Sequence, residues 1–206
     1  MGGFPGEALW SYVLVLAGGR RVLVDRTASP QSAEPLGLAG EFTDLSFYPS
    51  PPKNLRELAL SHDVILVCGG STANMLAVWR VHGFDAILRE AWDSGVLLTG
   101  WSTGLICWFE AGVTDSFGPQ LEGMNDGLGF LPGSACPHYD GEALRRPVYT
   151  SLVRGTFPEG IALDDGVAAH YVGTELQEIV TDRPDAGGYR VGRDGERSLP
   201  VRRLTW

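Results

Sequence analysis

The chain has 206 residues, of which 44% are hydrophobic, and a formal net charge of −9. A chain of this length can bury one sizeable core, so we expect a single α/β domain over residues 1–206. The acidic balance and the lack of a Lys/Arg run argue against nucleic-acid binding, because phosphate backbones would be repelled. No segment approaches the ~20 apolar residues of a membrane span, which predicts a cytoplasmic protein without membrane contact.

Hydrophobic periodicity predicts alternating helices and strands along the first half of the chain. A loop rich in Pro, Ser and Gly is expected from Thr27 to about Gly40. In chain order, the pattern predicts a helix at 8–17, a strand at 21–25, a strand at 42–48, a helix at 54–61, a strand at 64–67, helices at 72–82 and 85–94, and a strand at 96–99.

Further strand signals follow in the second half, at 161–163, 170–172, 177–180 and 189–191. Helices and strands that alternate at these lengths favour a mainly parallel central sheet with helices on both faces. We therefore expect a three-layer α/β sandwich.

The segment 96–104, VLLTGWSTG, carries a Gly-x-Ser-x-Gly turn directly after an apolar strand and before a helical segment. This is the sequence form of a nucleophile elbow, in which the serine hydroxyl is exposed on a strained turn above the sheet edge. Gly100 and Gly104 remove the Cβ atoms that would clash in such a turn. The motif makes Ser102 the candidate nucleophile.

A second glycine motif, VCGGSTAN at 67–74, also follows a strand. Successive glycines let backbone N–H groups approach a ligand oxygen, as half of an oxyanion hole requires. The other half would be the N–H of Thr103, the residue after the nucleophile. The motif lacks the Gly-Lys-Ser/Thr ending of a phosphate-binding P-loop.

A serine nucleophile needs a neighbouring base to accept its proton. Of the four histidines, His138 lies in a loop punctuated by Gly and Pro, GSACPHYD at 133–140, where an imidazole can face a cleft. The others, His62, His82 and His170, are interpreted as structural or surface residues.

The third member should be a carboxylate that orients the imidazole. Asp115, between the elbow helix and the histidine loop, is the preferred candidate, and Glu110, placed on the elbow helix, is the alternative. Glu142, four residues after His138, is a weaker option, and Asp164-Asp165 before Gly166 is interpreted as a turn.

Three cysteines, Cys68, Cys107 and Cys136, make an odd number in apolar or Gly-rich settings. This predicts reduced, buried thiols rather than disulfides. Their spacing is not that of zinc ligand pairs, so no metal site is expected.

Five motifs in order resemble the peptidase E family of serine peptidases, which includes aspartyl dipeptidase and, more distantly, cyanophycinase. They are GGSTANMLAVWR (69–80), GWSTG (100–104), CWFE (107–110), TDSFG (114–118) and GSACPHYDGE (133–142). The resemblance extends from about Gly2 to Leu176. It implies a fold like that of class I glutamine amidotransferases and cleavage of short peptides.

Carried over by motif, the resemblance makes Ser102 the nucleophile, His138 the base, Gly70 and Thr103 the oxyanion donors, and Asp115 the acid. Family members with a Ser-His-Glu arrangement would place Glu110 in that last role. Arg145 or Arg146 would hold an acidic substrate side chain, since a guanidinium suits a carboxylate.

Two features depart from the family pattern. Thr103 stands where alanine is usual, and we expect its extra bulk to crowd the oxyanion hole. The family also opens with an apolar strand, whereas Met1 is followed directly by glycines. The resemblance then implies either a start further upstream or a sheet with one strand fewer.

The resulting hypothesis is a serine peptidase that hydrolyses dipeptides or very short peptides without metal or organic cofactor, as a homodimer. Specificity for Asp-X dipeptides and a carboxypeptidase-like specificity are both compatible with the motifs. The alternatives are an esterase or amidase, or a binding protein on the same fold in which Ser102 is unreactive.

Overall fold

The computed structural model describes residues 1–31 and 36–205, and its first half is built on a parallel sheet. The strands run in the order β2-β1-β3-β4, and every neighbouring pair is parallel. Their bounds are β1 Arg21–Asp25, β2 Glu41–Leu45, β3 Val64–Val67 and β4 Leu97–Gly100. The predicted parallel sheet is thus confirmed, although the predicted loop at 27–40 lies partly outside the described residues.

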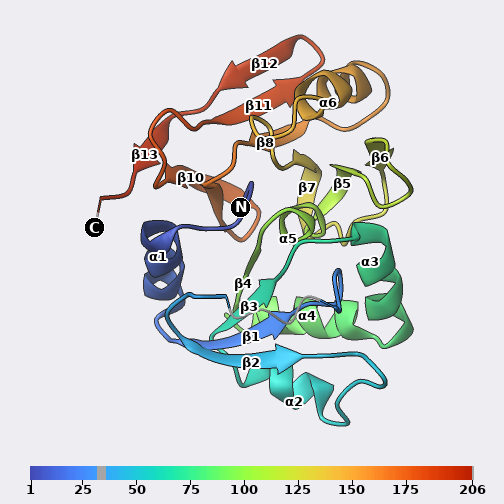
Figure 1. Ribbon diagram of the computed structural model, residues 1–206, viewed down its shortest axis with the longest axis vertical. Helices are drawn as coiled ribbons and strands as arrows, with labels where there is room; N and C mark the ends of the chain where they lie inside the picture. Colours follow the sequence, from blue (N-terminus) through green and yellow to red (C-terminus); the bar gives the residue numbers. More distant parts are fainter. Residues whose placement is uncertain (32–35, 206) are drawn as a thin grey trace.

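Helices cover both faces of this sheet, as the alternation of buried side chains along each strand requires (Figure 1). Val22 and Val24 of β1 pack with helix α1 (Glu7–Ala17), whereas Leu23 between them faces the opposite cluster. That cluster is covered by α2 (Leu55–Leu60), α3 (Thr72–Val81) and α4 (Phe84–Asp93). The three-layer α/β arrangement expected from the sequence is present.

After the short helix α5 (Thr103–Ile106), the chain builds a six-stranded sheet in the order β12-β11-β8-β7-β5-β6. Its inner strands β5, β7 and β8 are parallel, and α6 (Arg145–Arg154) packs on one face. The bounds are β5 Phe109–Thr114, β6 Glu122–Met124, β7 Leu131–Cys136, β8 Gly160–Leu163, β11 Gly188–Gly192 and β12 Gly195–Ser198.

A three-stranded sheet, β13-β10-β9, completes the described fold. Its strands are β9 Val167–Val172, β10 Glu175–Thr181 and β13 Val201–Arg203. All four strand signals predicted after residue 160 are strands here, each longer than expected. None of the described helices is long and apolar enough to cross a bilayer.

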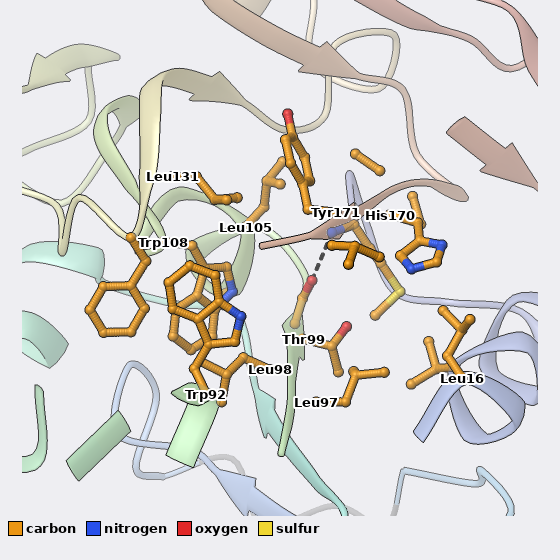
Figure 2. Close-up of a pocket in the computed structure, with 18 of the residues that line it drawn as sticks. Leu16, Trp92, Leu97, Leu98, Thr99, Leu105, Trp108, Leu131, His170 and Tyr171 are labelled. Atoms are coloured by element: carbon orange, nitrogen blue, oxygen red, sulfur yellow. Dashed lines mark hydrogen bonds between the residues drawn. The ribbon is translucent and has the colours of Figure 1, made fainter. Parts of the chain in front are cut away.

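A cavity of about 520 Å³ lies between β4 and β9 (Figure 2). Its lining is largely apolar and includes Leu98, Leu105 and Trp108. At one end the Met1 amino group donates a hydrogen bond of 2.8 Å to the Gly100 carbonyl, and burial lowers the pKa of that amine to about 5. Ser102 and His138 do not line the cavity, whereas Gly100 and Gly104, on either side of Ser102, do.

The carboxylate of Asp25, at the end of β1, is fully buried within a hydrogen-bond network. It accepts bonds from the Thr27 backbone N–H at 2.8 Å and from the Trp79 indole at 2.7 Å. Burial nevertheless raises the pKa of Asp25 to about 6, because a charged carboxylate loses its hydration there.

The buried Asp25 carboxylate predicts a specific pH dependence of stability. Its folded pKa lies above the ~3.9 of an unfolded aspartate, so the folded state binds the extra proton between about pH 4 and 6. The contribution of this group is therefore full below about pH 4 and is lost as the pH rises through 6. Relative to Asp25→Asn, we expect the free energy of unfolding to fall by on the order of 3 kcal/mol across that window.

Urea unfolding of both proteins at pH 4, 5, 6 and 7 measures this difference. Other groups titrate equally in the two proteins, so their effects cancel in the comparison. A difference between wild type and Asp25→Asn that stays constant over the four pH values would contradict the assignment.

Candidate active site

Ser102 occupies a strained backbone conformation at the carboxyl end of β4, with φ 55° and ψ −110°. It is the N-cap of α5, and the Leu105 and Ile106 N–H groups both donate to its carbonyl. A positive φ in a residue other than glycine costs of order 1–3 kcal/mol, and such strain is found mostly at functional sites. The strand-turn-helix elbow predicted from the sequence is therefore present.

Two glycines allow the elbow to pack closely against β3. A Cβ on Gly100 would lie 2.3 Å from the Val67 carbonyl oxygen, and a Cβ on Gly104 would lie 2.2 Å from the same atom. Both distances are far below van der Waals contact. The Val67 oxygen belongs to the backbone of β3, so it cannot move away as a flexible side chain could. The Gly-x-Ser-x-Gly spacing is thus a packing requirement of this turn.

We expect Gly104→Ala to destabilise the protein by about 3 kcal/mol, the upper end of the usual cost of overpacking. The matched control is Gly118→Ala, where a Cβ would meet nothing within 4 Å. Thermal or urea unfolding of the two variants gives the comparison. Equal stabilities would show that the elbow can move away from β3.

The two predicted oxyanion donors lie on neighbouring segments, the turn after β3 and the first residue of α5. Within the described ranges, neither the Gly70 N–H nor the Thr103 N–H donates a hydrogen bond to the protein. The Gly70 turn packs against residues 28–29, since a Cβ on Gly70 would lie 2.3 Å from the Ala28 carbonyl oxygen. Gly70 also has a φ of 141°, which glycine adopts without penalty.

The extra bulk of Thr103, which was expected to crowd the oxyanion hole, is packed inside the protein. Thr103 is buried, with 1% of its surface exposed, and its hydroxyl donates a bond of 2.5 Å to the Gly70 carbonyl. The Thr103 hydroxyl therefore ties the first residue of α5 to the turn after β3.

His138 follows β7 and also has a positive φ, of 54°. Its Nδ1 lies 2.7 Å from Oδ1 of Asp165, which stands just before β9. Apart from Asp185, Ser102 and His138 are the only residues other than glycine with positive φ in the described chain. A carboxylate bonded to Nδ1 would leave Nε2 of the ring as the nitrogen that accepts a proton.

The carboxylate that contacts His138 is therefore Asp165, and the assignment of Asp115 or Glu110 to this contact is corrected. Asp115 is exposed after β5, and its carboxylate has no hydrogen bond among the described residues. Glu110 lies on β5 rather than on the elbow helix, and its Oε2 accepts a bond of 2.8 Å from the Gly133 N–H. Glu142 instead pairs with Arg145 at 2.8 Å.

From the sequence, Asp165 was interpreted as part of a turn and not as the partner of His138. Its contacts show that it does form a turn. The Asp165 N–H bonds to the Asp140 carboxylate at 2.8 Å, while Arg183 bonds to the Asp165 carbonyl at 2.5 Å. These contacts hold a local turn and direct the carboxylate toward the histidine. The Asp-Asp-Gly segment after β8 was the available sequence signal.

The elbow and the His138–Asp165 pair are joined through the first residues of the chain. The Ser102 N–H donates to the Met1 carbonyl at 3.3 Å, and a Cβ on Gly3 would lie 2.3 Å from Oδ1 of Asp165. No hydrogen bond joins Ser102 to His138 within residues 1–31 and 36–205. Catalytic hydrogen bonds are often long in a protein without substrate and shorten when substrate binds.

The two arginines expected to bind substrate are both held by protein groups. Arg145 is 3% exposed and donates to the Val113 carbonyl at 2.7 Å and to Glu142. Arg146 lies 4.6 Å from the centre of the Tyr139 ring and retains an exposed side chain. Their role in substrate binding stays a prediction.

The remaining side chains singled out from the sequence have structural contacts. His62 Nδ1 lies 2.7 Å from the Leu58 carbonyl, His82 stacks on Phe47, and His170 Nδ1 lies 2.8 Å from the Tyr12 hydroxyl. The thiols expected to be reduced and buried are free and buried, and these are Cys68, Cys107 and Cys136.

Comparison with known proteins places this elbow and histidine loop in a family. The model of peptidase family S51 matches residues 29–179, and the chain belongs to that family. A relative in Bacillus subtilis (strain 168), the peptidase YgaJ, described as uncharacterized, is 49% identical over 165 residues, which are 78% of this chain and 71% of the relative. The chain is thus a member of a peptidase family and, by that membership, a hydrolase.

Solved structures share the fold at lower identity. A protein of Listeria monocytogenes EGD-e, provisionally designated peptidase E, matches with a TM-score of 0.63 and 18% identity over 85% of this chain and 94% of its own. A peptidase from an acI-B1 Actinobacterium matches with a TM-score of 0.64 and 18% identity over 97% of this chain and 92% of its own. The peptidase E resemblance and the fold inferred from the motifs are confirmed.

Proposed function

We propose that the protein is a serine peptidase that hydrolyses dipeptides or very short peptides through an acyl-enzyme on Ser102. The observation that carries the proposal is the strained elbow conformation of Ser102, at φ 55° and ψ −110°, beside two N–H groups that donate to no protein group among the described residues. The His138–Asp165 contact of 2.7 Å supplies the base and its orienting acid. Membership of peptidase family S51 supports the choice of an amide substrate.

The reaction follows from these roles. Ser102 Oγ attacks the scissile carbonyl carbon as its proton passes to His138 Nε2, and the carbonyl oxygen receives hydrogen bonds from the Gly70 and Thr103 N–H groups. The C–N bond then breaks, and the proton passes from His138 to the leaving amine. Water, deprotonated by the same imidazole, hydrolyses the ester and restores Ser102. The mechanism requires no metal or organic cofactor.

For substrate recognition we retain Arg146 as the candidate for an acidic side chain. Its side chain is 46% exposed, whereas the Arg145 guanidinium is buried between Val113 and Glu142. An Asp-X dipeptide would match this cation. We also propose that the enzyme acts in the cytoplasm as a homodimer.

A fluorophosphonate probe followed by a peptide panel tests the proposal. The probe should label the protein at one site per chain, because only an activated serine reacts stoichiometrically. Hydrolysis is then measured by mass spectrometry on Asp-X, Glu-X, X-Asp and end-blocked peptides. The products identify which end of the substrate and which side chain the enzyme recognises. Labelling without peptide hydrolysis would favour an esterase or amidase. The absence of both labelling and hydrolysis would favour a binding protein.

A further inference from the structure

Two separate segments supply the candidate oxyanion donors, and a buried side-chain hydrogen bond links them. Gly70 belongs to the turn after β3, and Thr103 begins α5 after β4. The Thr103 hydroxyl donates to the Gly70 carbonyl at 2.5 Å. The next N–H, that of Ser71, donates to the Ala28 carbonyl at 2.9 Å. The peptide between Gly70 and Ser71 is thus held at both its oxygen and its nitrogen.

The Thr103 hydroxyl is itself the acceptor at the end of a chain of hydroxyl groups. Thr72 Oγ1 donates to Thr103 Oγ1 at 3.2 Å, and Thr114 Oγ1 donates to Thr72 Oγ1 at 3.4 Å. All three threonine residues are at most 1% exposed.

The hydroxyl contacts extend beyond Thr114 to Ser116. Ser116 Oγ lies 2.7 Å from Thr114 Oγ1, and either hydroxyl can be the donor in this pair. The Ala73 N–H in the first turn of α3 donates to Ser116 Oγ at 3.3 Å. The network thus joins the first turn of α3 to the Gly70 carbonyl.

We infer that Thr103 is a positioning residue, which fixes the oxyanion hole through the bond from its hydroxyl to the Gly70 carbonyl and the hydroxyl network behind it. The inference rests on the proposed function. The bond holds the Gly70–Ser71 peptide and with it the Gly70 Cα, from which the donor N–H projects; among the described residues neither the Gly70 nor the Thr103 N–H donates to the protein. Aligned donors in such a chain polarise one another, so the loss of one hydroxyl loosens the whole turn.

The same network accounts for the TDSFG motif, which the proposed triad does not use. Thr114 and Ser116 direct their hydroxyls into the chain, whereas Asp115 between them is exposed. The loop after β5 therefore supports the oxyanion turn through its two hydroxyl residues.

Thr103→Val tests the inference, because valine keeps the shape and the backbone N–H but removes the hydroxyl. Misplacement of an oxyanion donor should lower kcat by about 10- to 10²-fold and leave KM within about twofold. The rate of fluorophosphonate labelling should fall by a similar factor. Thr103→Ser, which keeps the hydroxyl, should recover most of the rate. Thr150→Val, which removes a hydroxyl bonded within α6, is the matched control.

A second readout does not depend on hydrolysis. Hydrogen exchange of the Ser71 amide should be at least ~5-fold faster in Thr103→Val, because the peptide it belongs to has lost one of its two anchors. Thr114→Val breaks the chain two bonds earlier and should show a smaller change of the same sign, which covers the case in which Thr103→Val does not fold.

The outcomes separate this inference from the proposed function. Wild-type kcat and Ser71 exchange in Thr103→Val would overturn the positioning role, as would an equal loss in Thr103→Ser. A wild-type protein that neither hydrolyses peptides nor reacts with the probe would overturn the proposed function instead, and Ser71 exchange would still decide whether the hydroxyl chain holds the turn.

Discussion

Ser102→Ala is expected to abolish peptide hydrolysis, with kcat at least ~10⁴-fold below wild type, and to remove fluorophosphonate labelling. The proposed mechanism has no other group that can form the acyl-enzyme. Stability should change little, by about 2 °C or less in Tm, because the Ser102 hydroxyl has no hydrogen bond to the protein among the described residues.

Ser151→Ala, on the exposed side of α6, is the matched control for the loss of a serine hydroxyl. It should hydrolyse peptides and react with the probe at the wild-type rate. Near-normal hydrolysis in purified Ser102→Ala would contradict the serine mechanism.

Asp165→Asn is expected to lower kcat/KM by on the order of 10²–10⁴-fold while the fold is retained. The amide has the shape of the carboxylate but carries no negative charge and also contains an NH2 donor. It therefore stabilises the charged imidazole poorly and no longer selects the tautomer with a proton on Nδ1. The 2.7 Å contact between Asp165 Oδ1 and His138 Nδ1 is the basis of this expectation.

The carboxylates favoured by the sequence provide the controls. Asp115→Asn and Glu110→Gln should each stay within about 3-fold of wild type, since neither side chain contacts His138 among the described residues. Peptide hydrolysis by the three variants on one substrate decides the assignment. An active Asp165→Asn together with an inactive Asp115→Asn would instead assign the role of the acid to Asp115.

Most of the fold and half of the candidate site could be read from local pattern. The strand at 64–67 and the one at 21–25 have the predicted bounds, because strands buried on both faces appear as short apolar runs. The elbow could be recognised because its close approach to Val67 excludes every residue larger than glycine at positions 100 and 104. His138 was identifiable from the Gly/Pro-rich loop that carries it.

Glu110 shows where local pattern failed. The apolar run after Ser102 was interpreted as one helix, yet α5 ends at Ile106 and Phe109 begins β5, which pairs with β7. The hydrogen bonds of that sheet come from a strand more than 20 residues away, and they outweigh the helical preference of the run. Helix and strand cannot be told apart by periodicity in so short a segment.

Five motifs between residues 69 and 142 were sufficient to recognise a peptidase family member. Those around residues 100 and 138 reflect steric and conformational demands of single turns. The acid, by contrast, follows from tertiary structure. β7 and β8 are parallel neighbours, so His138 after β7 and Asp165 after β8 emerge at the same edge of the sheet, although 27 residues separate them. The direction of the Thr103 hydroxyl depends likewise on β3 and β4 lying side by side. Such contacts depend on strand order and register, which are set by packing across the whole sheet and leave no mark in the residues nearby.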